Sequence, residues 1–239
     1  MNFRLWIEQY FTVYRALELK PSTLSSYLKN LVYIPFDWEY ETVTLFDVQS
    51  LINKLVANGL SSSTVKHVVQ VIREPLDNGF RFGLPDRHGT LYALSLPKMR
   101  KKLVHALSDA ELTKLKPYLN ESEYSDVYLA LLHTGMRCCE LTGLNCGDFD
   151  FQSSSLKIHR SFYRGKLSEA TKSDSGIRVI PLNLPSKLIF IRNMCVFTPN
   201  KPLFRNLSGS RLSYNTLVHN WHKILDLADV ERCGLHVLR

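Results

Sequence analysis

The sequence predicts a mainly α-helical protein with a small antiparallel β-sheet, divided into two domains by a basic linker. Its 239 residues are enough for two separate hydrophobic cores. Apolar residues recur three or four positions apart through residues 1–83 and again through most of residues 107–239, which is the helical period. Alternation with a period of two occurs only within residues 155–182, which predicts the sheet. The intervening residues 84–106 are the predicted linker.

Residues 1–83 predict four short helices, each with recognisable start or stop signals. The first ends before Pro21, and the second begins just after it. Thr44 can cap the third helix, which Gly59 stops. The fourth follows Ser61-Ser62-Ser63 and has the clearest apolar stripe. Pro75 falls inside that stripe and is expected to kink the helix or end its regular part.

The linker interrupts this periodicity with glycine, proline and a dense group of cations. The cations are Lys98, Arg100, Lys101 and Lys102. A free-standing run of charge is usually only solvated surface. Between two basic domains, however, we expect these side chains to follow a phosphate backbone.

The second domain begins with a capping box, in which Ser108 and Glu111 can satisfy each other's backbone amides. Residues 127–133 are apolar nearly all round, so this helix should be central and buried. The β pattern then follows, with a turn at residues 172–176 between its two segments. Helices resume at 184–193 and 213–228.

The composition favours a polyanionic partner. The formal net charge is +8, and the isoelectric point is about 9.2. Residues 1–106 hold 13 Lys and Arg against 9 Asp and Glu, and residues 107–239 hold 17 against 13, so each part carries +4. An even excess suggests that both domains face one polyanion, nucleic acid before anionic membrane.

The sequence does not favour a membrane-spanning, secreted or metal-binding protein. No apolar run is long enough for a transmembrane helix, and Glu8 and Gln9 interrupt any signal-peptide core. The five cysteines form no CxxC pair and no zinc-like spacing with histidine, so we expect reduced thiols and no metal site.

Three clusters in the second domain could carry chemistry. Arg137 follows the buried helix, and it either pairs with Glu140 as a structural ion pair or presents its planar fork to a phosphate. Lys172 lies in the β-turn, where a lysine is usually solvated surface. His236 and Arg239 are three residues apart, which places them on one face of a helix.

The order of these clusters resembles the catalytic domain of the tyrosine recombinases, the phage integrase family. The matching segments are TGMRCCELTGLNCGDFD from Thr134, KSDSGIRVIPL from Lys172, and HVLR from His236. The segments LKPSTLSSY and GLSSSTVKHVV also resemble the core-binding domain of that family. The resemblance implies a SAM-like helical core-binding domain followed by an α+β catalytic domain.

The resemblance also implies roles for these residues. Arg137 and Arg239 would hold the scissile phosphate and neutralise charge in the transition state, while Lys172 would protonate the leaving 5′-oxygen. His236 would hydrogen-bond the phosphate and assist proton transfer. Glu140 and Asp148 match the motif as supports. No metal or other cofactor is implied, because a phosphotyrosine link conserves the energy of the broken bond.

The family's nucleophilic tyrosine should follow the HxLR arginine, so we expect it beyond Arg239. Of the eleven tyrosines, Tyr163 and Tyr214 lie in a β segment and an earlier helix, and neither fits the motif. The catalytic domain is therefore expected to be incomplete and the chain alone not competent for cleavage. The implied function is site-specific recombination or integration, by DNA cleavage and rejoining through a 3′-phosphotyrosyl intermediate, in a mobile genetic element. The alternative is a non-catalytic DNA-binding protein or competitor derived from a recombinase.

The expected partners are duplex DNA, clamped by the two domains, and further protomers in a tetrameric synapse; no membrane partner is expected. We expect a cytoplasmic, nucleoid-associated protein. A type IB topoisomerase shares the chemistry, but the four-helix domain fits a recombinase better. Beyond the linker cations, the predicted DNA contacts are Lys66, Arg73 and Arg178.

Overall fold

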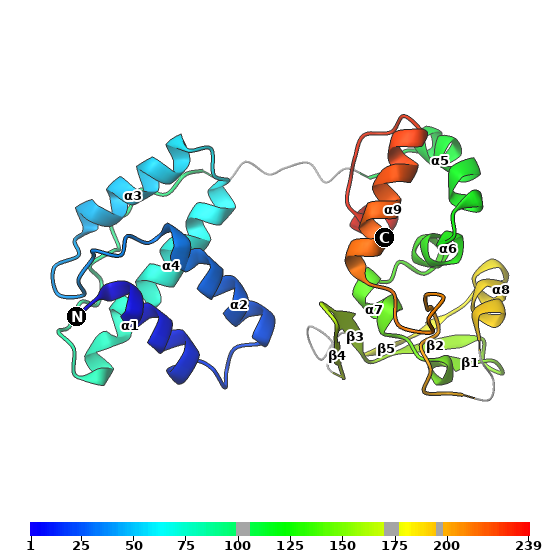
Figure 1. The fold of residues 1–239 in the computed structure, drawn as a ribbon, viewed down its shortest axis with the longest axis horizontal. Coiled ribbons are helices and arrows are strands. Elements are labelled where there is room, and N and C mark those ends of the chain that lie inside the picture. Colours follow the sequence, from blue (N-terminus) through cyan, green and yellow to red (C-terminus); the bar gives the residue numbers. More distant parts are fainter. Residues whose placement is uncertain (99–105, 170–176, 195–197) are drawn as a thin grey trace. The chain divides into compact units, whose positions relative to one another are not determined.

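The computed structural model describes residues 1–98, 106–169, 177–194 and 198–239. The chain forms two compact units, Met1–Lys102 and Leu103–Arg239, each with its own hydrophobic core. Figure 1 shows that the first is built from helices and the second from helices and short strands. In the described residues no helix combines the length and the apolar character needed to cross a bilayer.

The N-terminal unit contains the four predicted helices. They are α1 (Phe3–Gln9), α2 (Pro21–Asn30), α3 (Leu45–Ala57) and α4 (Ser62–Asn78), with short helical extensions η1 (Tyr10–Tyr14), η2 (Leu31–Tyr33) and η3 (Gly79–Phe82). Thr44 caps α3 in a capping box with Asp47, and the Ser61 hydroxyl caps α4. Pro75 does not end α4, which continues to Asn78.

Most of the described part of the predicted linker packs on the N-terminal core. Leu91 is buried, and Leu84, Leu94 and Leu96 lie against the same core. The Arg73 guanidinium donates to the carbonyl of Leu91 at 3.0 Å and so holds this segment on α4. These leucines are spaced too irregularly to show a helical or strand period, which is why the sequence pattern did not include them in the domain.

In the C-terminal unit, a small sheet lies beside a group of helices. Its helices are α5 (Asp109–Glu121), α6 (Ser125–Thr134), α7 (Cys138–Gly143), η4 (Cys146–Asp148), α8 (Leu184–Asn193), α9 (Tyr214–Leu227) and η6 (Leu235–Leu238). The predicted capping box of Ser108 and Glu111 starts α5, and the predicted buried helix is α6.

Two antiparallel sheets are present in the described part of this unit, where the sequence pattern predicted one. The first has the order β1 (Phe149–Asp150), β2 (Ser155–Ile158), β5 (Arg178–Pro181). The second is a hairpin of β3 (Ser161–Tyr163) and β4 (Lys166–Ser168). Its turn residues Arg164 and Gly165 both have positive φ, as a two-residue hairpin turn requires. Because β4 is exposed throughout, it carries no apolar alternation that the sequence could reveal.

Candidate active site

Arg137 is positioned by a tight turn between two helices. α6 ends at Gly135, whose φ of +62° is the left-handed conformation that favours glycine, and its amide donates to the Leu131 carbonyl at 2.9 Å. The chain then reverses, and Arg137 becomes the residue that precedes α7. The TGMR segment of the sequence therefore forms the turn that positions Arg137.

Glu140 holds Arg137 through two contacts. Its Oε1 accepts from Nη1 of Arg137 at 2.7 Å, and its Oε2 accepts from the backbone amide of Arg137 at 3.0 Å. Oε2 also accepts from Nη2 of Arg178 at 2.7 Å. Burial raises the pKa of Glu140, but the hydrogen bonds from Arg178 and Arg137 outweigh this effect and lower the pKa to about 2. Glu140 is therefore an ionised support rather than a proton donor.

The side chain of Arg137 is partly exposed to solvent. Its side chain is 35% exposed, and among the described residues only Nη1 of its guanidinium has a hydrogen-bond partner. The sequence left two alternatives open, a structural ion pair or a phosphate ligand. The geometry is compatible with both at once, because one nitrogen pairs with Glu140 while about a third of the side chain is exposed.

The HxLR segment lies next to the same turn. Leu235 and Leu238 are buried in the core, while His236 and Arg239 point outward from η6. A Cβ added to Gly135 would lie 3.9 Å from Cγ of Arg239, so the stem of this arginine lies against the turn that carries Arg137. The indole of Trp221 donates to the Cys233 carbonyl at 2.9 Å and fixes the loop that precedes η6.

Lys172 lies outside the described residues, as do Arg100, Lys101 and Lys102. The described chain ends after β4 at Glu169 and resumes at Ile177, immediately before β5. The role predicted for Lys172 stays a prediction.

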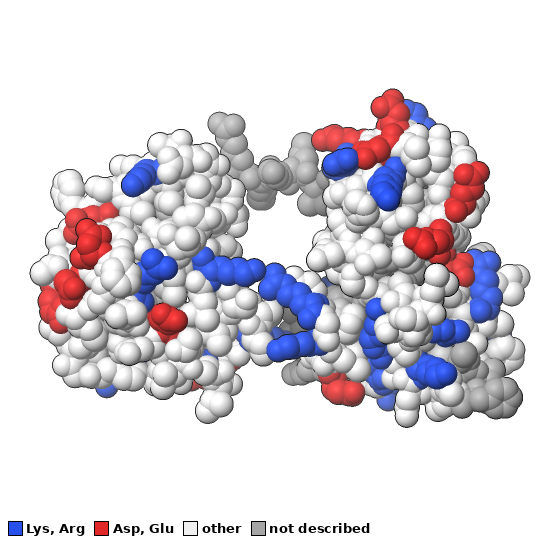
Figure 2. Space-filling model, viewed as in Figure 1, with Lys and Arg blue, Asp and Glu red and all other residues white. Residues whose placement is uncertain are grey.

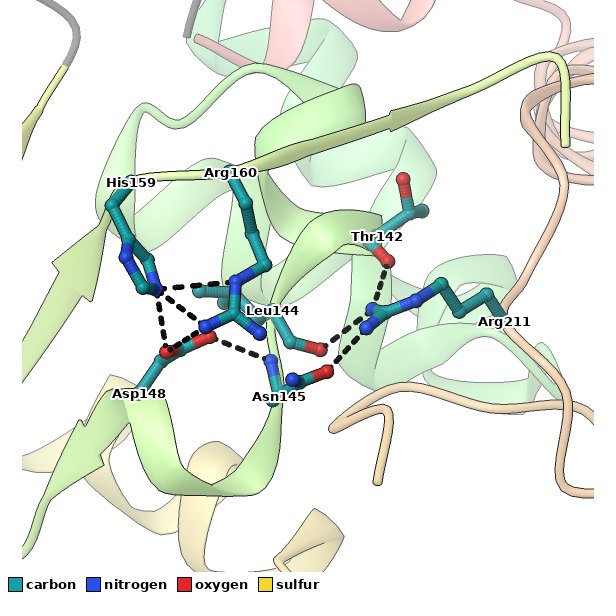
Figure 3. Close-up of polar contacts among 7 residues, drawn as sticks. All are labelled: Thr142, Leu144, Asn145, Asp148, His159, Arg160 and Arg211. Carbon is teal, nitrogen blue, oxygen red and sulfur yellow. Dashed lines mark hydrogen bonds and ion pairs between the residues drawn. The ribbon is translucent and has the colours of Figure 1, made fainter. Parts of the chain in front are cut away.

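Asp148, the second predicted support, is the centre of a buried polar network (Figure 3). Its Oδ2 accepts from the amide of Asn145 at 2.7 Å, and its Oδ1 lies 3.2 Å from Nη2 of Arg160 and 3.0 Å from Nε2 of His159. The side chain of Arg160 is only 13% exposed. Asp148 thus joins the segment after α7 to the connection between β2 and β3.

Arg211 anchors the other end of α7, although no pattern in the sequence predicted this role. Its Nη1 donates to the carbonyls of Thr142 at 2.9 Å and Leu144 at 3.0 Å, and its Nη2 donates to the side chain of Asn145 (Figure 3). A cation at these carbonyls complements the negative end of the helix dipole. Burial, together with the nearby charge of Arg160, lowers the pKa of Arg211. No spacing or motif around this arginine distinguishes it in the sequence.

The predicted DNA contacts differ in their surroundings. Lys98 is exposed, and Lys66 is half-buried on α4. Arg73 is occupied with the Leu91 carbonyl, and Arg178 with Glu140. On the face of the C-terminal unit seen in Figure 2, Lys and Arg concentrate over the half that holds the strands, whereas Asp and Glu lie mostly over the helical half.

Tyr163 and Tyr214, which do not fit the position of the family's nucleophile, lie beside each other. The rings of Tyr163 and Tyr214 pack with their centroids 6.5 Å apart, and Arg164 lies over the ring of Tyr163. Burial raises the pKa of Tyr214, which opposes formation of a phenolate. Among the described residues, no group of three or more His, Cys, Asp or Glu side chains is placed to hold a metal ion.

The site thus combines two outward arginines, a histidine and a carboxylate that orients rather than reacts. The planar guanidinium group of arginine is well suited to binding phosphate oxygens. Comparison with known proteins specifies the class. The family model described as the phage integrase family matches residues 123–239. Residues 123–239 thus match this family, the tyrosine recombinases.

Among curated proteins, the chain is similar to a tyrosine recombinase XerC-like protein of Caldanaerobacter subterraneus subsp. tengcongensis. The two are 24% identical over 181 residues, which cover 69% of this chain and 45% of that protein. The chain therefore spans less than half the length of the curated relative that it matches.

Solved integrase structures share the fold. The Tn1549 transposon integrase in complex with transposon right end DNA matches with a TM-score of 0.84 and 15% identity, over all of this chain and 84% of that one. A lambda integrase dimer bound to a COC′ core site matches with a TM-score of 0.77 and 16% identity, over all of this chain and 87% of that one. The architecture predicted from the sequence, a helical domain followed by an α+β recombinase domain, is confirmed at the level of fold.

Proposed function

We propose that this chain binds duplex DNA and takes part in site-specific recombination or integration through a 3′-phosphotyrosyl intermediate. The observation that carries the proposal is the placement of Arg239 against the Gly135 turn, beside an Arg137 that Glu140 orients. The integrases that share the fold include proteins bound to DNA, one as a dimer at a core site and one as a tetramer at a Holliday junction.

In the proposed reaction, Arg137 and Arg239 bind the non-bridging oxygens of the scissile phosphate. Their charge stabilises the additional negative charge that develops in the transition state. Glu140 stays ionised, because its pKa is about 2, and it limits the movement of the Arg137 fork. His236 is exposed on η6 and hydrogen-bonds the phosphate. Lys172 is the general acid that protonates the leaving 5′-oxygen.

The proposed nucleophile is a tyrosine outside residues 1–239. The raised pKa of Tyr214 does not favour it as the attacking group, and Tyr163 lies in β3, ahead of the HxLR segment that the family's nucleophile follows. The same observations support a second candidate function, a DNA-binding protein that occupies recombination sites without cutting them. The two differ in whether a covalent adduct can form once a tyrosine is supplied.

The test compares two proteins on suicide substrates. One is the chain itself, and the other is the chain joined at Arg239 to a tyrosine-bearing C-terminal segment of a family member. Duplexes are first selected from a random library for binding to the chain, and are then nicked. We expect a covalent protein–DNA band in a denaturing gel for the extended chain only. Arg137→Ala should abolish that band and leave most of the DNA binding, because this charge acts mainly in the transition state.

Each other outcome is informative. An adduct with the unextended chain would move the nucleophile to Tyr163 or Tyr214. DNA binding without any adduct from the extended chain would favour the non-catalytic function. Absence of salt-sensitive DNA binding would refute both candidate functions.

A further inference from the structure

The helix α7 begins at the turn that positions Arg137 and contains the carboxylate that holds it. Arg137 directly precedes the helix, and Glu140 within it contacts both the backbone amide and the guanidinium of Arg137. The helix has only six residues, and a helix of this length is not stable on its own. The position of Arg137 therefore depends on the contacts that hold α7 in place.

A side chain from a distant segment, Arg211, holds the C-terminal end of this helix. Its Nη1 donates to the carbonyl of Thr142 at 2.9 Å, inside the last turn of α7, and to that of Leu144 at 3.0 Å. Its Nη2 donates to the side-chain oxygen of Asn145 (Figure 3). The Leu144 carbonyl also accepts from the amide of Leu203, whereas the contact with the Thr142 carbonyl is made to the helix itself.

The position of Arg211 is fixed in turn by its surroundings. Its guanidinium carbon lies over the ring of Phe162 in β3, 5.9 Å from the ring centroid. The next residue in the chain, Leu212, is buried, and Ser213 then caps α9 with its hydroxyl. Arg211 therefore connects the end of α7 to β3 and to the start of α9.

We propose that Arg211 is a positioning residue for Arg137, because it fixes the end of the six-residue helix whose start carries the phosphate-binding arginine. Without this guanidinium, the last turn of α7 loses its hydrogen bond to the segment before α9, while Arg178 still holds Glu140 in the first turn. We expect the helix to tilt about its first turn, which changes where Arg137 points. This inference rests on the proposed recombinase function.

The step that depends on this positioning is the neutralisation of charge at the scissile phosphate. The tyrosine oxygen loses its proton and bonds to phosphorus, while the bond to the 5′-oxygen breaks and that oxygen leaves as a hydroxyl. During this exchange, negative charge accumulates on the non-bridging oxygens, where fixed cations stabilise it. Arg211 lies at the opposite end of α7 from Arg137, so its loss should affect this step through the guanidinium of Arg137.

The test uses suicide DNA with a methylphosphonate at the cleavage site. A methyl group replaces one non-bridging oxygen, so the reacting group starts neutral and carries less charge in the transition state. The need for a second arginine is then reduced. Of the two diastereomers, the one on which Arg137→Ala in the extended chain recovers cleavage is used for the other variants. Arg211→Met replaces the guanidinium by an unbranched apolar side chain.

A selective recovery is the expected result. On ordinary phosphate, Arg211→Met in the extended chain should slow formation of the covalent adduct about 100-fold, the effect of a misplacement of about 1 Å. On the methylphosphonate, its defect relative to the unsubstituted protein should be about threefold or less, because that reaction no longer depends on Arg137. If Arg211→Met does not fold, Arg211→Lys is measured instead, because it keeps the charge but lacks the planar fork that spans the carbonyls and the Asn145 side chain.

Arg205 provides a matched control within the same unit. Its Nη1 donates to the carbonyl of Asn193, the last residue of α8, at 3.1 Å and to that of Pro202 at 3.3 Å. It therefore makes the same kind of contact as Arg211, but with a helix that carries no residue of the proposed site. Arg205→Met should unfold at a lower urea concentration, yet cleave both substrates at the rate of the unsubstituted protein.

The outcomes separate the inference from the proposed function. Equal slowing of the Arg211 variant on both substrates would mean that Arg211 supports the fold in general, and would overturn the inference. Unchanged cleavage of the ordinary phosphate, or a selective recovery by Arg205→Met as well, would also overturn it. If Arg137→Ala recovers on neither diastereomer, the role proposed for Arg137 fails and the inference fails with it. If the unsubstituted extended chain forms no adduct, the proposed function itself fails.

Discussion

Replacing Glu140 by glutamine should make the stability of the C-terminal unit less dependent on pH. The carboxylate is buried, and its hydrogen bonds from Arg178 and Arg137 require the ionised form. Glutamine is almost the same size and keeps one oxygen acceptor, but it carries no charge. The substitution therefore removes the ionic part of the interaction with little change in packing.

The magnitude follows from the pKa of Glu140, which the fold lowers from 4.5 to about 2. At about 1.4 kcal/mol for each pH unit, the ionised carboxylate stabilises the folded unit by roughly 3 kcal/mol. Because the folded-state pKa is lowered, this stabilisation is fully present above pH 4.5 and is lost as the pH falls toward 2. Roughly 2 kcal/mol of it should be gone by pH 3.

Urea denaturation of both proteins at pH 7 and pH 3, followed by tryptophan fluorescence, measures this effect. Glu140→Gln should lower the free energy of unfolding of the C-terminal unit by roughly 2–3 kcal/mol at pH 7, and the difference between the two proteins should shrink to roughly 1 kcal/mol or less at pH 3. The transition of the N-terminal unit is the internal reference. Glu121→Gln, at an exposed carboxyl in the last turn of α5, is the matched control. Equal pH dependence in the Glu140 variant and the unsubstituted protein would refute the assignment of Glu140 as an ionised anchor.

Three further outcomes are expected. Gly143→Ala should destabilise the C-terminal unit by about 1–3 kcal/mol in thermal unfolding, because the added Cβ would lie 2.9 Å from the backbone of Ser161; an unchanged melting temperature would contradict this packing. Arg211→Met should cost about 1–3 kcal/mol in urea, because the Thr142 carbonyl loses this donor and the Leu144 carbonyl keeps only the amide of Leu203; a neutral result would mean that water replaces the guanidinium. The affinity for duplex DNA should fall with salt with a log–log slope of about −0.9 for each phosphate contact, and charge reversal of the four linker cations together should flatten that slope; an unchanged slope would place the linker away from the DNA.

The sequence predicted those parts of the molecule that depend on local signals. Capping residues start α3 and α5 where the sequence placed them, because a cap and its partner lie within three residues of each other. The pair of Arg137 and Glu140 is local in the same way, and the structure contains it. The resemblance to a family supplied the rest of the expected site, since nothing in the local pattern brings Arg239 to the turn at Gly135.

Contacts between distant segments were not predictable from periodicity. Arg178 pairs with Glu140 across 38 positions, and Arg211 reaches the end of α7 across 69. α7 itself is six residues long, too short to show a helical period. The leucines of residues 84–98 are apolar without being periodic, so they were interpreted as linker although they cover the N-terminal core.

The distant contacts of Arg178 and Arg211 both fix the position of α7. A helix of six residues has little stability of its own, so its position must come from its surroundings. At its first turn, Glu140 is held by Arg137 and Arg178. At its end, Arg211 binds the carbonyls of Thr142 and Leu144. Close approach of the β3 backbone to Gly143 leaves no room for the helix to slide toward that strand. Arg137 is thus carried by a short element that arginines fix at both ends, and a phosphate ligand placed by such an element needs little reorganisation when charge develops on it.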